Sequence, residues 1–383
     1  MADFWSEFKR FFRKGDVVLL VLCLAISAFG CLIIASTNNY RGYERYVMMQ
    51  LVAIAIGVAA YIFMSCIDLE WLSEHRRLLM IGSLGLIALL IPFGTDLGSG
   101  NKSWLDIPGF PMYIQPAEIC KILFIVILGS IMNAHQNKIS SPRSVLHMAA
   151  ALAALVGLNV LISRDVGVSL IFVFIFAGMA FGGGVKIWWF LGVIAAVVAA
   201  FPILWPHLQE HQRNRIMILF DPTIDPLGID ERYHLVRSLK SLTAGGLTGQ
   251  GLFNGNRTQA GVLPSQHTDF IFSAIGEELG YLGCVLVLVM LLAVILRCIW
   301  VGQQTHDYMR RMVCFGAASA LIFQVCVNVG MCMGVMPVIG LTLPLISYGG
   351  SSIVTIYAML GLVSGVCARP APKSHERYVR PPR

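Results

Sequence analysis

A small set of charged residues lies within or beside long apolar stretches, where charge is costly. They are Glu118, Lys121, Asp165, Asp269, Glu277 and Glu278. A charged side chain in a membrane span costs about 2.5 to 3.5 kcal/mol on insertion scales, so such residues usually line a cavity, relay protons or bind a substrate or an ion. The chemistry of this chain is therefore expected among them.

Asp269 opens an apolar helix in the stretch PSQHTDFIFSAIGEELG. Helix capping is the simple explanation, because the helix dipole favours an acidic group there and Thr268 could serve as the N-cap. The crowd of polar groups entering the same helix favours a functional site instead. At about 100° per residue only Glu277 could share a cavity with Asp269, and Glu278 would face another helix. A structural role is favoured for both glutamates.

Two further acidic positions offer the same choice between structure and function. Glu118 and Lys121 stand three residues apart in QPAEICK, on one face of a helix start. They could form a self-contained ion pair or line a cavity. Asp165 could pair with Arg164 or cap the helix that follows it. His267, in a loop, is expected to be a solvated imidazole.

The elements that must position these residues are apolar helices. Of 383 residues, 57% are hydrophobic and 13% are charged, about half the roughly 25% of a soluble domain, and the mean hydropathy is +0.73. These values identify an integral membrane protein and leave no room for a large soluble domain. Each span needs about 20 mostly apolar residues. Ten such runs occur, at 17–36, 46–66, 78–94, 116–132, 145–163, 165–182, 187–206, 269–296, 312–336 and 345–368.

We therefore expect an all-α polytopic membrane protein with ten transmembrane helices and both termini on one side. Lys and Arg concentrate in the terminal tails, 1–16 and 369–383, and in the loops on the same side. The positive-inside rule assigns that side to the cytosol, giving an N-in, C-in orientation. The domain organisation expected is one transmembrane domain over 1–383, with a long extracytoplasmic loop at 207–268 between spans seven and eight.

The outer side also carries the unusual segments. Within the long loop, YHLVRSLKSLTAGG predicts an interfacial helix that ends at Gly245 and Gly246. Two prolines and a Gly pair at 337–352 predict a broken helix, which membranes tolerate where it is protein-buried or lines a wet cavity; a simple kink is the alternative. Trp104 is expected to be an interfacial anchor. The ten cysteines lack metal-ligand spacing and are expected to be small core residues.

Taken together, these segments resemble the SEDS family, the RodA, FtsW and SpoVE proteins of bacterial cell-wall synthesis. The matching stretches follow the family order over most of the chain. They are GNKSW at 100–104, QPAEICK at 115–121, RDVGVSL at 164–170, RNRIMILFDPTIDPLG at 213–228, GGLTGQG at 245–251, LPSQHTDFIFSAIGEELG at 263–280 and PVIGLTLPLISYGGSS at 337–352.

The resemblance implies an inverting glycosyltransferase that polymerises lipid II at the outer face of a bacterial cytoplasmic membrane. It makes Asp269 the catalytic residue, a base that removes the proton of the acceptor sugar hydroxyl. Lys121, Lys102 and Arg215 become candidates for stabilising the departing pyrophosphate. The residues expected to support catalysis or bind substrate are Glu118, Lys121, Lys102, Trp104, Arg215, Asp165, His267 and Ser347.

The same resemblance sets expectations for cofactors and partners. A divalent cation, Mg²⁺ or Mn²⁺, held by Glu118 or Asp269 together with the pyrophosphate would aid departure, and no organic cofactor is expected. The implied partners are lipid II, a class B penicillin-binding protein, other elongation or division proteins and membrane lipids, with no nucleic acid. Short termini and the DPTIDPLG wording favour a RodA-like over an FtsW-like chain.

Two other functions stay open from the sequence. Carboxylates within the membrane and a broken helix also suit a flippase or transporter of a lipid-linked precursor, although the two halves show no repeat. A non-catalytic scaffold of the cell-wall machinery is the third possibility.

Overall fold

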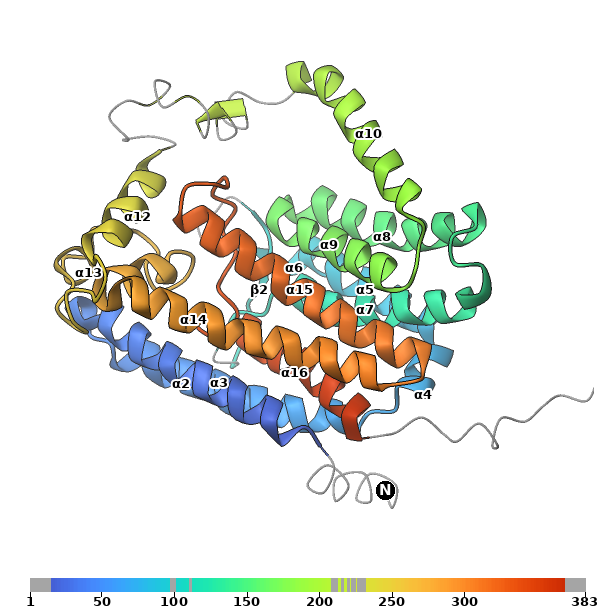
Figure 1. The fold of residues 1–383 in the computed structure, drawn as a ribbon, viewed down its shortest axis with the longest axis horizontal. Coiled ribbons are helices and arrows are strands. Elements are labelled where there is room, and N and C mark those ends of the chain that lie inside the picture. Colours follow the sequence, from blue (N-terminus) through green and yellow to red (C-terminus); the bar gives the residue numbers. More distant parts are fainter. Residues whose placement is uncertain are drawn as a thin grey trace, which may run out of the picture.

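Figure 1 shows the chain in a computed structural model, which describes residues 15–96, 101–109, 112–207, 213–214, 217–218, 221, 225 and 232–368. The tails at 1–14 and 369–383 lie outside the described residues. The main helices are α2 (Val17–Thr37), α3 (Glu44–Cys66), α5 (Arg76–Ala88), α7 (Pro116–Ala134), α8 (Pro142–Ser163), α9 (Val166–Gly182), α10 (Ile187–Leu204), α14 (Ile271–Gln304), α15 (Tyr308–Cys332) and α16 (Gly350–Ala368). The shorter elements are η1 (Asn39–Arg41), α4 (Leu69–Glu74), α6 (Leu90–Phe93), β1 (Gly94–Thr95), β2 (Trp104–Leu105), η2 (Gln136–Lys138), η3 (Trp205–His207), α12 (Tyr233–Ala244) and α13 (Asn256–Gln259).

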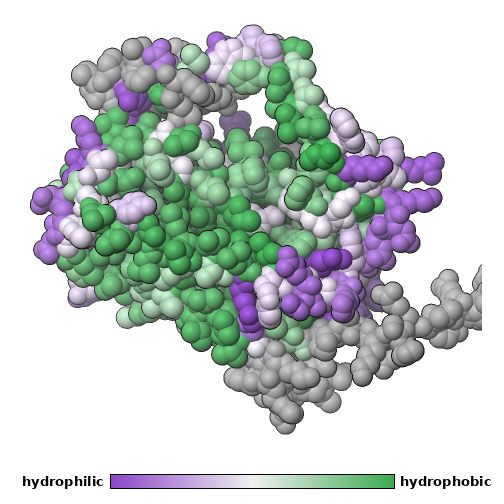
Figure 2. Space-filling model, in the orientation of Figure 1, coloured by the Kyte–Doolittle hydropathy of each residue, from purple (hydrophilic) through white to green (hydrophobic). Residues whose placement is uncertain are grey.

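Most of these helices run side by side in one bundle (Figure 1). Within the described part of the chain, eight are long and apolar enough to cross a membrane, with α5 and α6 together making one of them. Two shorter apolar helices, α9 and α10, accompany them. Figure 2 shows a hydrophobic surface over the middle of the bundle and hydrophilic residues at its two ends. The prediction of a helical, multi-pass membrane protein is confirmed, and the count of ten spans stays a prediction.

The all-α prediction agrees with the described residues apart from one short ladder of two-residue strands. After α6 the chain turns back on itself, and β1 pairs antiparallel with β2, with Gly94 opposite Leu105 and Thr95 opposite Trp104. Leu105 also exchanges backbone hydrogen bonds with Ile114. A Gly- and Pro-rich stretch does not form the regular hydrogen bonds of a helix. Its backbone N–H and C=O groups pair across a short ladder instead.

α16 packs against α3 at very short range because two glycines, Gly361 and Gly365, line the contact. A Cβ at Gly361 would overlap the carbonyl oxygen of Tyr61, and one at Gly365 would lie 2.8 Å from the carbonyl oxygen of Ser65. Small residues four positions apart allow membrane helices to approach this closely.

Asp16 joins four helices at one end of the bundle. It is the N-cap of α2, and its carboxylate accepts two hydrogen bonds from Arg297 of α14, at 2.8 and 3.0 Å. Its backbone N–H donates to Ser364 Oγ of α16, and its carbonyl oxygen accepts from Tyr61 Oη of α3, each at 3.0 Å. A carboxylate only 2% exposed is thus fully paired, as burial of a charge requires.

α14 is interrupted at Gly280, whose φ of 67° and ψ of −164° are not helical. The loop GGLTGQG at 245–251 fills this break. Its Gln250 N–H donates to the carbonyl oxygen of Glu277 at 3.0 Å, and its Gly251 N–H donates to the carbonyl oxygen of Glu278 at 2.9 Å. The helix predicted in the preceding stretch is α12, which ends before Gly245 as expected, while its interfacial position stays a prediction.

The acidic side chains at this break serve the structure, as predicted. One Glu277 oxygen accepts the backbone N–H of Arg257 at 2.6 Å. Glu278 accepts Ser36 Oγ at 2.7 Å and Gln259 Nε2 at 2.9 Å. Both side chains are fully buried and hold the loop between α12 and α14 against α2.

The non-helical backbone predicted at 337–352 is confirmed up to Gly349, but the last span itself is one continuous helix and not a helix in two parts. α15 ends at Cys332 and α16 begins at Gly350, and the residues between them form turns and extended backbone. The ten cysteines carry free thiols, most of them buried, as expected for small core residues.

We predict that Gly361→Ala lowers the free energy of unfolding by about 1 to 3 kcal/mol, because the added methyl group would force α16 away from α3. The matched control is Gly157→Ala in α8, where a Cβ would meet no atom within 4 Å; this change should be neutral or stabilise by up to about 1 kcal/mol. Thermal unfolding of the purified variants in detergent measures both. Equal melting temperatures for the two variants would contradict the packing argument.

Candidate functional site

A cavity of about 500 Å³ brings together residues from distant parts of the chain. Its walls come from the 101–104 stretch, the start of α7, the turn between α8 and α9, the residues just before α14, the middle of α15, and the non-helical segment that leads into α16. Four of the residues expected from the sequence line it. They are Trp104, Glu118, Asp165 and Asp269.

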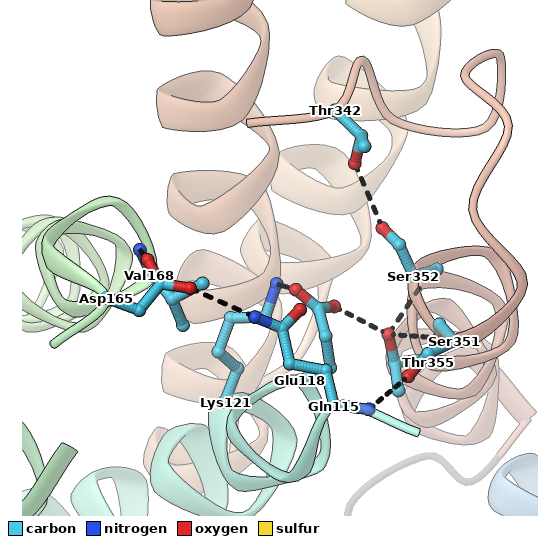
Figure 3. Close-up of polar contacts among 9 residues, drawn as sticks. All are labelled: Gln115, Glu118, Lys121, Asp165, Val168, Thr342, Ser351, Ser352 and Thr355. Atoms are coloured by element: carbon cyan, nitrogen blue, oxygen red, sulfur yellow. Dashed lines mark hydrogen bonds and ion pairs between the residues drawn. The ribbon is translucent and has the colours of Figure 1, made fainter. Parts of the chain in front are cut away.

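Glu118 and Lys121 form a buried ion pair at one wall (Figure 3). Lys121 Nζ lies 2.7 Å from Glu118 Oε1, and both side chains are 5% exposed. The second carboxylate oxygen of Glu118 accepts a hydrogen bond from Thr355 Oγ1 of α16 at 2.8 Å. Both alternatives from the sequence are therefore realised, because the pair is intrahelical and Glu118 also lines the cavity.

Asp165 is tied to the same wall through an amide. Gln115 Nε2, at the residue before α7, donates to Asp165 Oδ2 at 3.1 Å (Figure 3). Asp165 Oδ1 accepts the Val168 N–H at 3.0 Å, so this residue is the N-cap of α9, one of the predicted roles. Gln115 also receives support from α16, because Ser351 Oγ accepts its backbone N–H at 3.2 Å.

Asp269 lies ahead of α14 and faces the non-helical segment before α16. The N-cap of α14 is Phe270, which makes no side-chain cap bond, so the helix-capping explanation for Asp269 is wrong. Asn328 Nδ2 of α15 donates to the Asp269 carbonyl oxygen at 2.8 Å and fixes its backbone. Gly340 lies beside this carboxylate, since a Cβ there would be 3.6 Å from Asp269 Oδ2, and its φ of 72° favours glycine at this position.

The environment of Asp269 suits proton transfer. Burial raises the pKa of its carboxyl to about 6, and a hydrogen bond from Thr268 partly offsets this rise. A carboxylate with a pKa near the working pH is a more effective general base than one at its ordinary value. Asp269 is half-buried and lines the cavity, so a bound hydroxyl could reach it.

The three cationic side chains predicted to stabilise the pyrophosphate lie in different environments. Lys121 lies beside a much smaller void next to the cavity and forms an ion pair with Glu118. Lys102 is exposed, between the cavity-lining residues Asn101 and Ser103. Arg215 lies outside the described residues.

His267 and Ser347 do not line the cavity. The His267 ring packs against Tyr46 and Tyr348, with centroids 5.2 and 5.5 Å away, so the expected solvated imidazole is wrong. Burial, with Arg41 nearby, lowers the pKa of His267 to about 4, which keeps the ring neutral. Ser347 Oγ donates to the Thr268 carbonyl oxygen at 2.6 Å and thereby fixes the backbone of the residue before Asp269.

Several uncharged polar residues of the site were missed by a search for ionisable groups. Gln115, Gln324, Tyr348 and Ser352 all line the cavity. Gln324 is the clearest omission, because an amide in the apolar helix α15 is itself a signal of a polar environment. It is 2% exposed, and its Oε1 has no hydrogen-bond partner among the described residues.

The residues of the site offer few ligands for a divalent cation. Across the described ranges, no three His, Cys, Asp or Glu side chains gather closely enough to hold a metal ion. Glu118 is a poor ligand, because Lys121 and Thr355 occupy its two oxygens. Asp269 keeps lone pairs available. Mg²⁺ is often bound by one or two carboxylates plus substrate phosphates, so Asp269 is the residue that fits.

We predict that Lys121→Met destabilises the protein by about 3 to 5 kcal/mol, since it leaves the buried Glu118 carboxylate without its cation. The double variant Glu118→Gln with Lys121→Met removes both charges and should regain most of this loss. Thermal unfolding measures each. If the single and double variants unfold at the same temperature, the two charges are not coupled.

Comparisons with known proteins agree with this architecture. Residues 16–370 match the model of the cell cycle protein family that comprises FtsW, RodA and SpoVE. The chain is 32% identical to the peptidoglycan glycosyltransferase MrdB of Escherichia coli strain K12 over 357 residues, which is 92% of this chain and 93% of that protein. It is 30% identical to the peptidoglycan glycosyltransferase RodA of Mycobacterium bovis, over 94% of this chain and 79% of that protein.

Solved structures give the same result. One is a chain from work on the structural coordination of polymerization and crosslinking by a peptidoglycan synthase complex. It superposes with a TM-score of 0.79 at 29% identity and covers 92% of this chain and 97% of that one. The crystal structure of the rod shape determining protein RodA of Thermus thermophilus gives 0.70 at 25% identity, with 94% and 98% covered. The chain therefore belongs to the FtsW, RodA and SpoVE family of cell cycle proteins, the SEDS family.

Proposed function

We propose that this protein is a peptidoglycan glycosyltransferase that polymerises lipid II into glycan strands. The observation that carries the proposal is the carboxylate of Asp269, which has a pKa raised to about 6 and lines a cavity with both polar and apolar walls. The curated relatives named as peptidoglycan glycosyltransferases support it over nearly the whole chain.

In the proposed reaction, Asp269 accepts the proton of the acceptor sugar hydroxyl. The acceptor oxygen then forms a bond to the anomeric carbon of the donor sugar with inversion. The bond from that carbon to the pyrophosphate oxygen breaks, and its electron pair leaves with the polyprenyl pyrophosphate. Preorganised donors and cations around the leaving group lower the barrier most effectively in a site that excludes water.

The supporting residues take roles that follow from their positions. Glu118, held by Lys121 and Thr355, shapes one wall of the cavity, and Gln115 holds Asp165 on the same wall. The exposed Lys102 and the loop residue Arg215 are our candidates for contacting the pyrophosphate. Trp104 offers a half-buried aromatic face to the sugar or the lipid. His267 and Ser347 hold the backbone next to Asp269.

A divalent cation, Mg²⁺ or Mn²⁺, would supply further charge stabilisation for the pyrophosphate when bound. Asp269 is the residue we propose to hold it, together with the substrate phosphates. No organic cofactor enters the proposal.

We further propose ten spans in the N-in, C-in orientation, with α9 and α10 as the sixth and seventh, in the cytoplasmic membrane of a bacterium. The domain is then 1–383, with cytosolic tails at 1–16 and 369–383 and the outer loop at 207–268. The basic residues of the tails and of the loops on the same side support this orientation.

The partner we propose is a class B penicillin-binding protein acting with a RodA-like chain in cell elongation. The similarity to a chain of a peptidoglycan synthase complex and to RodA and MrdB proteins supports this choice. FtsW proteins are also similar, so the division role is the competing assignment within the family.

We predict that Asp269→Asn abolishes polymerisation, because the amide cannot accept the hydroxyl proton. Purified protein is incubated with lipid II, alone and with the penicillin-binding protein, and glycan strands are resolved on a gel. The matched control is Asp106→Asn, an exposed carboxylate in the outer segment that does not line the cavity, which should retain activity. Strands at the wild-type level from the Asp269 variant would refute its role as the base.

We also predict a characteristic pH dependence. Asp269 with a pKa of about 6 is protonated and inactive as a base below that value, so the rate should fall about tenfold per pH unit below pH 6. A carboxyl with an ordinary pKa near 4 would keep the rate constant down to that value. Melting temperatures over the same range show that the protein stays folded. A rate that is unchanged between pH 7 and pH 4.5 would contradict the assignment.

A further inference from the structure

A second cavity, of about 460 Å³, lies between α5, α7 and α8. Its α7 residues, Ile127 and Ile131, belong to the half of that helix that is remote from Glu118. It is therefore near the opposite end of the bundle from the candidate active site, and none of the roles proposed above uses it.

The lining of this cavity is divided into a basic part and an apolar part. Arg76 and Arg77 come from the start of α5, and His147 comes from α8. The remaining walls are Met80, Ile81, Ile127, Ile131, Ala150, Ala151 and Ala154. None of the lining residues is acidic. A ligand that fits both parts carries an anionic group and a hydrocarbon chain.

The positive charges at the mouth are available to a ligand. Arg77 is exposed and makes no hydrogen bond or ion pair within the described residues. Arg76 makes one long hydrogen bond, 3.5 Å, to the carbonyl oxygen of Ser130, and has no carboxylate partner there. The His147 ring is engaged by another histidine, because its Nδ1 lies 3.2 Å from His135 Nε2. Two adjacent guanidinium groups without counterions can bind a phosphate through several charge-assisted hydrogen bonds.

Three alanines make the space for the chain. Ala150, Ala151 and Ala154 lie on neighbouring positions of one face of α8, opposite Ile127 and Ile131 of α7. Small side chains there leave an apolar recess where larger ones would close it. A free phosphate makes no apolar contact with this recess, whereas an acyl chain can fill it and gain van der Waals contacts with the alanines and isoleucines.

We propose that this cavity binds one anionic glycerophospholipid, with its phosphate on Arg76 and Arg77 and part of an acyl chain against the α8 alanines. Basic pockets between transmembrane helices bind anionic headgroups in this way. With the orientation proposed above, the lipid belongs to the inner leaflet. It occupies a site separate from the one proposed for lipid II and stabilises the packing of α5 against α7 and α8.

The test uses the purified full-length protein and measures lipid retention by native mass spectrometry, with phosphatidylglycerol as the probe and phosphatidylcholine of the same chains as the comparison. The wild type should retain one phosphatidylglycerol in preference to phosphatidylcholine. Arg76→Gln with Arg77→Gln should weaken retention by about fivefold for each arginine. The control, Lys138→Gln with Arg143→Gln, removes the same charge from exposed residues outside the cavity and should behave like the wild type.

A second variant keeps the charges and fills the recess. Ala150→Leu with Ala154→Leu should also reduce phosphatidylglycerol retention, and it decides the matter if the arginine variant does not fold. Equal retention in the arginine variant and its control, or equal retention of the two lipids by the wild type, overturns the proposal. So does inorganic phosphate that raises the melting temperature as much as phosphatidylglycerol, since that result identifies a free-anion site. Polymerisation is not measured, so failure here leaves the proposed function untouched.

Discussion

The buried ion pair between Glu118 and Lys121 is the interaction on which the candidate site depends. In a low-dielectric interior a carboxylate must be matched by a cation and by hydrogen bonds, or it is too costly to keep. Lys121 supplies the charge, and Thr355 supplies the second bond from α16. The start of α7 is thereby fixed against α16, which the glycine contact fixes against α3. The polar wall of the cavity is thus attached to the most closely packed part of the bundle.

Among the described residues, four buried carboxylates contrast with that of Asp269 when the partners of their oxygens are compared. Asp16, Glu118, Glu277 and Glu278 have carboxylates engaged by cations, hydroxyls, amides or backbone N–H groups of other elements. Asp269 is held through its backbone by Asn328, while its carboxylate faces a cavity and Gly340. A carboxylate that is held in place but not neutralised by a protein cation is available for chemistry. The distinction comes from long-range partners and not from residue type.

The same distinction explains what could be predicted from the sequence. The non-helical segment before α16 and the end of α12 were predictable because they depend on local prolines and glycines, whereas the break at Gly280 within α14 was not predicted. The intrahelical pair of Glu118 and Lys121 was predictable for the same reason. The packing of His267 between two tyrosines depends on residues far away in the chain, and no local pattern indicates it. The amide of Gln324 within the apolar helix α15 was a local signal that a search for ionisable groups passed over. The β1 and β2 pairing was missed because each strand has only two residues.

The break in α14 at Gly280 also bears on how the protein is made. The backbone groups near that break are satisfied by the GGLTGQG loop, which precedes the helix in the chain. During synthesis the loop leaves the ribosome first, so its N–H groups are present when the interrupted helix emerges. The loop can therefore pair those carbonyl oxygens as the helix enters the lipid, where each unpaired group would cost several kcal/mol. The order of the chain thus supplies the hydrogen-bond partners in advance, because the loop that completes the span is synthesised before it.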